Sequence, residues 1–329
     1  MMTTLSLMGV PDHILVDSWA QYVHFYLQCV VSIKHNTLEQ PMHAQGRIER
    51  ALNAAIDLTD AADAPPQLAA ALRYATFPGG ARIRPRLCLA VAATCGDQDP
   101  VLADAAASAI ELLHCASLVH DDLPCFDDAA TRRGKPSLHQ TFGAPMAVLT
   151  GDALIVLAFE TLARGAAHAP HRLPELIGII GRAAGAPRGI VAGQAWESEA
   201  QPDLAAYHQA KTASLFAAAT LAGAYAAGVK HTMWRRLGEL LGEAYQVADD
   251  IRDVVSNPDE IGKPVGRDLA LQRPSATRDL GVAGAVARLD GLVDAAIDSI
   301  PDAPGSAVLR AMIRAEAQHF LPKEISRAA

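Results

Sequence analysis

The chain has 329 residues, of which 50% are hydrophobic and only 5% aromatic, and its formal net charge is -8. This composition supports a sizeable core, and the negative charge argues against a nucleic-acid binder, which would need a basic face. No run of about 18 uninterrupted apolar residues occurs, so we expect no membrane span.

The cysteines are five in number and show no C-x-x-C spacing. An odd number without paired spacing argues against a disulfide framework or a zinc site. We therefore expect buried, free thiols in a reducing compartment, and hence a cytoplasmic protein. The cysteines are Cys29, Cys88, Cys95, Cys115 and Cys125.

Residues 1–41 differ from the remainder of the chain. They are rich in Val, Tyr and His, contain no Arg, and lack the charged start and the cleavage pattern of a signal peptide. A helix-compatible stretch begins at Met42. We expect residues 1–41 to be a poorly ordered extension or a start-site artefact, and residues 42–329 to form the working domain.

Helical spacing dominates from Met42 onward, and strand-like alternation is scarce. Apolar residues recur at three- and four-residue intervals from Ala105 to Leu123 and again from Trp234 to Val255. Proline and glycine interrupt such runs throughout. The pattern predicts a single all-α domain. Two pairs of glycines spaced by four predict close helix contacts: Gly189 with Gly193, and Gly238 with Gly242.

Two acidic clusters lie near the ends of these predicted helices. The first is HDDLPCFDD from His120, in which Pro124 is expected to end the helix. The second is DDIRD from Asp249, in which Asp249 and Asp253 are four apart and share a helix face. Carboxylates on one face repel each other unless a cation lies between them. Two groups of oxygen ligands suit Mg²⁺, although a solvated acidic edge would show the same pattern at either cluster.

Basic residues accompany both clusters. Arg132, Arg133 and Lys135 follow the first, and Lys263, Arg267 and Arg273 follow the second. Earlier in the chain, the stretch GGARIRP puts Arg82 and Arg84 on a turn after a glycine pair. The planar fork of Arg matches phosphate oxygens, so Arg beside a Mg²⁺ site indicates a polyphosphate ligand. Surface ion pairs with the aspartates are the alternative.

These motifs together resemble the trans-isoprenyl diphosphate synthase family, and within it the bacterial geranylgeranyl diphosphate synthases of carotenoid pathways. DDLPCFD is similar to the first aspartate-rich motif of that family and DDIRD to the second. GGARIRP, GQAWE, KTASLF and GKPVGRD are similar to its other signatures. The resemblance covers roughly Met42 to the C-terminus.

The resemblance implies an isoprenoid synthase-type helical bundle around a deep central cavity, with the two acidic motifs facing each other across it. It also implies a homodimer that binds three Mg²⁺ ions once substrate is present. The reaction it implies is the condensation of isopentenyl diphosphate with an allylic diphosphate, expected to be farnesyl diphosphate, to give geranylgeranyl diphosphate.

Site residues follow from the resemblance position by position. The implied metal ligands are the aspartates of the two motifs: Asp121, Asp127 and Asp249, supported by Asp122, Asp250 and Asp253. The implied ligands of the allylic diphosphate are cationic: Arg132, Lys211 and Lys263. The implied ligands of isopentenyl diphosphate are Arg84, His114 and Arg133. The implied catalytic residues around the nascent allylic cation are Lys211, Thr212 and Gln246.

Three positions depart from the family pattern. Ala81 stands where the family usually has Lys, and Arg82 is a candidate to compensate for the missing contact to isopentenyl diphosphate. Glu197 replaces the usual Asp of the GQAWE motif, and Arg273, expected to bind substrate, replaces a common Lys. Both Glu197 and Arg273 keep the side-chain charge that is usual at their positions.

Product length in this family depends on what plugs the cavity below the first aspartate motif. Leu113, Ala116 and Ser117 lie one and two helical turns before Asp121. The small side chains of Ala116 and Ser117 leave the cavity open by about 5.4 Å more, one helical turn. This favours geranylgeranyl over farnesyl diphosphate, although a farnesyl diphosphate synthase remains the alternative. A terpene cyclase would normally lack the second motif, and a non-catalytic subunit of a heteromeric synthase usually loses both.

Overall fold

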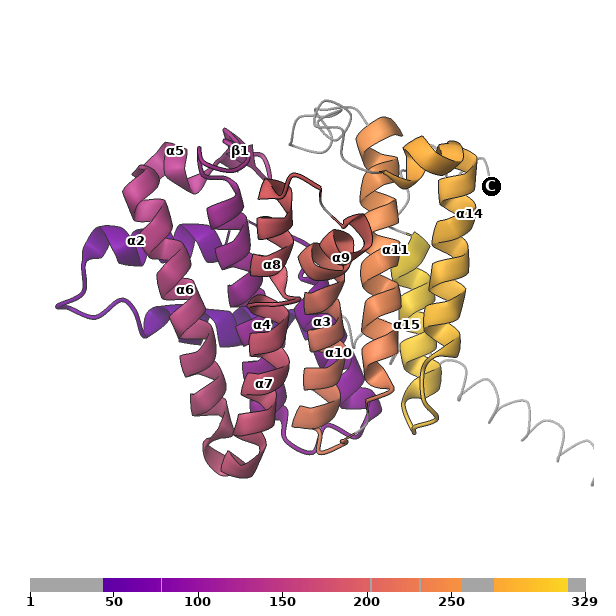
Figure 1. The fold of residues 1–329 in the computed structure, drawn as a ribbon. Coiled ribbons are helices and arrows are strands. Elements are labelled where there is room, and N and C mark those ends of the chain that lie inside the picture. Colours follow the sequence, from indigo (N-terminus) through magenta and orange to yellow (C-terminus); the bar gives the residue numbers. More distant parts are fainter. Residues whose placement is uncertain (1–43, 78, 202, 231, 256–274, 319–329) are drawn as a thin grey trace, which may run out of the picture. The chain divides into compact units, whose positions relative to one another are not determined.

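The computed structural model describes residues 44–77, 79–201, 203–230, 232–255 and 275–318. These residues are almost entirely helical, which confirms the predicted all-α class (Figure 1). A first helix covers residues 44–57. The longer helices that follow are α2 (Pro66–Thr76), α3 (Ile83–Thr94), α4 (Pro100–Asp121), α6 (Ala144–Gly165), α7 (Leu173–Ala184), α10 (Ser214–Ala226), α11 (Trp234–Val255), α14 (Ala276–Asp298) and α15 (Ser306–Gln318).

Shorter elements connect these helices. They are the two-stranded antiparallel β1 (Thr131–Arg132) and β2 (Lys135–Pro136), the helices α5 (Leu138–Phe142), α8 (Ile190–Ala195) and α9 (Leu204–His208), the 3-10 turns η1 (Ala166–His168), η2 (Pro170–Arg172) and η3 (Trp196–Ser198), and the π-helical turn η4 (Gln209–Ala213).

Helix α4 is the central helix of the core. It packs against α3 and α10 on one side and against α6 on the other, so apolar residues are buried around most of its circumference. It begins at Pro100, one turn earlier than the predicted Ala105, because Asp99 caps it: the Asp99 side chain accepts a hydrogen bond from Leu102 N at 3.1 Å. It ends at Asp121, in front of Pro124 as predicted.

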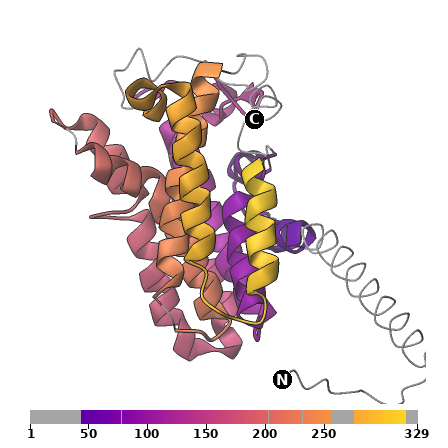
Figure 2. The ribbon, with the colours of Figure 1, turned by 90° about the vertical axis from the view of Figure 1, so that its right-hand side faces the viewer.

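The remaining helices extend this core to one side. Helix α10 packs on α3, α4, α7 and α11, and α11 packs on α14. Helix α15 then returns against α3, as Figure 2 shows. Helix α11 has the bounds that the sequence pattern predicted, Trp234 to Val255.

The predicted close contacts between helices are confirmed for three of the four glycines. A Cβ on Gly238 would lie 2.4 Å from Ala217 Cα, and one on Gly242 would lie 2.5 Å from Ala213 Cα. A Cβ on Gly193 would lie 2.5 Å from Lys211 N on η4, whereas one on Gly189 would meet Gly185 O in the turn that precedes α8. These distances are too short for a side chain, so the glycines let backbones approach directly.

Two described helical segments, Pro100–Asp121 and Ala144–His168, are long and apolar enough to cross a membrane by length and composition alone. The first is α4, most of which is buried in the core. The second is α6 with the turn that follows, and a smaller share of it, 39%, is buried. The sequence pattern had excluded such candidates because it counted only uninterrupted apolar runs.

Candidate active site

A cavity of about 750 Å³ lies among α4, α6, α7, α8, η4 and α11. One part of its wall is charged, and another is apolar and includes Leu113, Ile155 and Phe159. Most of the predicted site residues line it: Arg84, Leu113, His114, Ala116, Ser117, Asp121, Asp127, Arg132, Lys211, Thr212, Gln246, Asp249 and Asp253. Residues more than a hundred positions apart in sequence therefore share one cavity.

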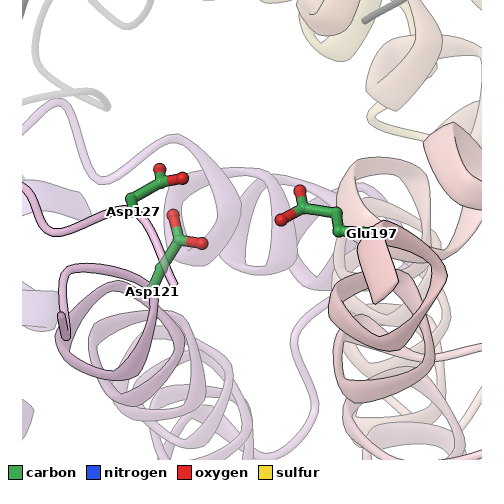
Figure 3. Close-up of side chains that lie close together, drawn as sticks. All are labelled: Asp121, Asp127 and Glu197. Atoms are coloured by element: carbon green, nitrogen blue, oxygen red, sulfur yellow. The ribbon is translucent and has the colours of Figure 1, made fainter. Parts of the chain in front are cut away.

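The first acidic motif folds back on itself at the end of α4. After Pro124 the chain turns, and Asp127 N donates to Asp121 O at 2.9 Å. This turn sets the Asp127 carboxylate beside that of Asp121, and Glu197 faces both from the opposite wall (Figure 3). One carboxylate oxygen from each of the three lies within 4.8 Å of the others. This spacing allows one cation to contact all three.

The electrostatics of this cluster favour a bound cation. Burial raises the pKa of Asp121, the neighbouring Asp127 and Glu197 raise it further, and Lys211 and Arg132 act against them. A divalent cation would relieve the repulsion among the carboxylates and remove the cost of their burial. The residues present therefore fit a Mg²⁺ site.

The second acidic motif divides between two roles. Asp249 and Asp253 line the cavity, as one face of a helix requires. Asp250 lies outside the cavity lining: its carboxylate accepts from Gln246 Nε2 at 3.0 Å and from Ala276 N at 2.8 Å. Gln246 in turn accepts from Thr212 Oγ1 at 2.8 Å. Asp250 thus orients a cavity residue and holds the start of α14.

Asp122 is likewise absent from the cavity lining. It is buried, and it accepts hydrogen bonds from Arg132, whose Nε lies 3.0 Å from Asp122 Oδ1. The Arg132 guanidinium also lies 3.7 Å from Asp121 Oδ2. Asp122 therefore holds Arg132 against the cavity wall beside the first motif.

A second group of cationic side chains surrounds His114. Arg84 Nη1 lies 3.4 Å from His114 Nε2, and the guanidinium of Arg84 lies 4.7 Å from the Phe216 ring centroid. Burial lowers the pKa of His114 well below its usual value, and the charges of Arg84 and Arg133 lower it further. A neutral imidazole among arginines leaves this part of the cavity positively charged, as an anion-binding site requires.

Arg133 reaches this region from a tight hairpin. Arg133 and Gly134 have φ values of 53° and 75° between β1 and β2, the left-handed pair that a two-residue hairpin turn needs. The guanidinium donates to Gly79 O, and a Cβ on Gly80 would lie 2.7 Å from Arg133 Cζ. The glycine pair thus makes room for Arg133 beside the turn that leads to Arg84.

Arg82 does not take the place of the missing Lys at Ala81. It is 4% exposed, and its guanidinium donates to Glu111 at 2.7 Å, to Glu49 at 3.0 Å and to Thr76 O at 2.7 Å. The suggested compensation is therefore wrong. Arg82 and Arg84 are two residues apart at the start of α3, so they point in different directions, and only Arg84 faces the cavity.

The expectation of buried thiols holds for some of the cysteines. Cys88 and Cys115 are buried and free, and Cys95 is half-buried. Cys125 is exposed, because it follows Pro124 on the turn of the first acidic motif. Cys29 lies outside the described residues, as do the predicted substrate ligands Lys263 and Arg273.

Two residues were given no role from the sequence but lie at the site. Glu197 belongs to the GQAWE stretch, and its carboxylate closes the acidic cluster. Tyr207 lies four residues before Lys211 and donates to Glu197 Oε1 at 2.8 Å. The similarity of GQAWE to a family signature was a signal for Glu197, whereas nothing in the pattern indicated Tyr207.

Carboxylates and cations around a large, partly apolar cavity in a helical domain are typical of an enzyme that acts on an apolar substrate carrying diphosphate. Comparison with known proteins identifies the family. Residues 65–282 match the family model described as polyprenyl synthetase, so the chain belongs to the polyprenyl synthetase family. The resemblance to trans-isoprenyl diphosphate synthases is confirmed.

Two similar curated proteins are bacterial. The geranylgeranyl diphosphate synthase of Cereibacter sphaeroides is 53% identical over 285 residues, which are 87% of this chain and 99% of that protein. The geranylgeranyl diphosphate synthase of Rhodobacter capsulatus is 51% identical over 280 residues, 85% of this chain and 97% of that protein.

Among solved structures, the geranyltransferase of Helicobacter pylori complexed with magnesium and isoprenyl diphosphate is 30% identical, with a TM-score of 0.72. The match covers 84% of this chain and 97% of that one. The geranyltransferase of Legionella pneumophila is 26% identical, with a TM-score of 0.73, over 88% of this chain and 98% of that one. The fold is thus that of isoprenyl synthases.

Proposed function

We propose that this protein condenses isopentenyl diphosphate with farnesyl diphosphate to give geranylgeranyl diphosphate and diphosphate, in a Mg²⁺-dependent reaction. The observation that carries the proposal is the shared cavity, which Asp121 and Asp249 line at its charged part and Ala116 at its apolar part. Two curated relatives that are more than half identical to this chain are named geranylgeranyl diphosphate synthase, which supports the proposed product.

The charged side chains fit two diphosphates. Arg132 and Lys211 flank Asp121 and would hold the allylic diphosphate, with Lys263 and Arg273 as further ligands from the part of the chain that is not described. Arg84 and Arg133 form the second positive group, and together with His114, which lies beside Arg84, they would hold isopentenyl diphosphate. Two separate anion sites are what a condensation of two diphosphates needs.

The metal ligands in this proposal are Asp121, Asp127 and Asp249, with Asp253 nearby and with Asp122 and Asp250 as supports through Arg132 and Gln246. We expect three ions when substrate is bound. When bound, Mg²⁺ would stabilise the negative charge that develops on the departing diphosphate.

The chain itself would stabilise the allylic cation. The Thr212 hydroxyl donates a hydrogen bond to Gln246 Oε1, and both residues line the cavity, so the lone pairs of the Thr212 oxygen would be available to the cation. Oxygen dipoles fixed in this way need no reorganisation as positive charge develops. The ammonium of Lys211 and the guanidinium of Arg132 would stay with the diphosphate, which is a plausible base for the final proton loss.

The catalytic unit in this proposal is residues 42–329 acting as a cytoplasmic homodimer. Helix α6 supports the dimer, because Val148, Leu149 and Val156 are exposed large apolar residues on it. Leu149 and Val156 are seven residues apart and thus share a helix face, and Val148 lies at the edge of that face.

The test is a product assay with purified protein, Mg²⁺, isopentenyl diphosphate and farnesyl diphosphate, read by mass spectrometry. Geranylgeranyl diphosphate supports the proposal, and removal of Mg²⁺ with a chelator should abolish its formation. In a second assay with geranyl diphosphate as the primer, accumulation of farnesyl diphosphate without further elongation would instead support a farnesyl diphosphate synthase. Hydrocarbon products, or no product without a partner protein, would overturn the proposal.

A further inference from the structure

The carboxylate of Glu197 accepts hydrogen bonds from three side chains. Lys211 Nζ lies 2.5 Å and Tyr207 Oη 2.8 Å from Oε1, and Gln194 Nε2 lies 2.9 Å from Oε2. Lys211 Nζ also lies 3.5 Å from Asp121 Oδ1, across the cavity wall. Glu197 and Asp121 therefore hold the ammonium between them.

The backbone is shaped for this contact. Lys211 lies on the π-helical turn η4, a distortion that occurs frequently at functional sites. A Cβ on Gly193 would lie 2.5 Å from Lys211 N and 2.6 Å from its Cα, so α8 touches η4 backbone to backbone. Glu197 follows Gly193 by one helical turn and extends along the same side as Lys211.

We propose that Glu197 is a positioning residue that fixes the Lys211 ammonium at the place where the allylic diphosphate binds. The inference rests on the proposed function, which supplies that substrate. A lysine ammonium is a mobile charge on a four-carbon stem. Holding it before the substrate arrives lowers the entropic cost of binding.

A direct metal ligand is the competing role for Glu197, since its carboxylate lies within 4.8 Å of Asp121 and Asp127. The hydrogen bonds favour positioning. Both oxygens of Glu197 already accept hydrogen bonds, one from an ammonium and a phenol and the other from an amide. A Mg²⁺ ion on Oε1 would displace one of its two donors and would meet the Lys211 charge.

The experiment measures steady-state kinetics of full-length wild type, Glu197→Gln, Lys211→Met, the double variant and Glu197→Asp, with thermal unfolding as a check of folding. Glu197→Gln should raise KM for the allylic diphosphate about tenfold. KM for isopentenyl diphosphate and the half-saturating Mg²⁺ concentration should stay within about twofold. Glu197→Asp keeps the charge and should be intermediate. Glu199→Gln is the matched control, because Glu199 is exposed two residues further along, and should match wild type.

The double variant gives the sharpest outcome. If Glu197 acts through Lys211, adding Glu197→Gln to Lys211→Met should change KM for the allylic diphosphate by no more than about twofold. Multiplicative losses, a raised Mg²⁺ requirement in Glu197→Gln, or equal effects on both substrates would each overturn the inference. If the wild type forms no elongated product, the proposed function is wrong. If the wild type is active and Glu197→Gln leaves KM for the allylic diphosphate unchanged, only the positioning role is wrong.

Discussion

His114 is a buried residue whose neutral imidazole lies near several arginine side chains. Burial is the main cause of its lowered pKa, and Arg84, Arg133, Arg132 and Arg82 add to it, from α3 and from the β1–β2 hairpin. Each of these charges opposes a proton on the ring. An anion bound among them would reverse that effect, because a diphosphate neutralises the arginines and favours the imidazolium.

We therefore predict that isopentenyl diphosphate raises the pKa of His114, observed by NMR titration of the imidazole protons with and without ligand. The stability consequence has a definite sign. A lowered folded-state pKa means that the unfolded chain binds more protons below about pH 6.5, so stability from this residue is lost as pH falls through that value. His114→Gln should flatten this loss, measured by urea unfolding at pH 7.5 and about pH 5.5. An unchanged His114 signal on ligand binding would contradict the prediction.

Ala116 is the residue at which product length should respond most directly. It lines the cavity on α4, so we expect a larger side chain there to occupy part of the cavity. Ala116→Tyr should shift the product distribution from geranylgeranyl toward farnesyl diphosphate, measured by mass spectrometry of the chain-elongation products. An unchanged distribution would contradict the plug model.

At the scale of elements, direct backbone contact sets how helices assemble. Helix α11 carries Gln246, Asp249 and Asp253, and its distance from α10 and η4 is set at Gly238 and Gly242. The second acidic motif can reach the cavity only if α11 lies this close. Glycines that have no functional side chain therefore determine the position of the proposed metal ligands on α11.

Gly238→Ala and Gly291→Ala form a matched pair that tests this. Both glycines are helical, but a Cβ on Gly238 would lie 2.4 Å from Ala217 Cα, whereas one on Gly291 has nothing within 4 Å. Gly291→Ala should stabilise the protein by about 1 kcal/mol through helix propensity. Gly238→Ala should destabilise it by about 1–3 kcal/mol through overpacking. Thermal unfolding measures both, and a neutral or stabilising Gly238→Ala would show that α11 has room to move.

At the scale of the whole molecule, the apolar face of α6 should be the contact of the proposed homodimer. Val156 is 66% exposed on a helix of which only part is buried in the core. A second copy covering this face would remove the exposed apolar area from water.

We predict that Val156→Glu weakens or abolishes the dimer, measured by sedimentation velocity. Its control is Val308→Glu, an exposed valine on α15, which lies away from α6 (Figure 1) and should leave the dimer intact. A dimer that tolerates Val156→Glu would place the interface elsewhere.

The local sequence pattern was sufficient to predict part of the fold and part of the candidate site. The all-α class and the bounds of α11 follow from apolar periodicity, and the end of α4 follows from Pro124, since each depends on neighbouring residues alone. The two acidic motifs were recognisable for the same reason, because the carboxylates of each cluster come from residues that are close together in the sequence.

Side-chain direction was decided only by tertiary packing. Arg82 and Arg84 read alike in GGARIRP, but Glu111 and Glu49 hold the first in the core while the second faces the cavity. Asp250 and Asp122 belong to the motifs yet lie behind the cavity-lining residues Gln246 and Arg132, and Glu197 joins the acidic cluster from a distant segment. Which way such a side chain points depends on partners far along the chain, and a short stretch of sequence does not contain them.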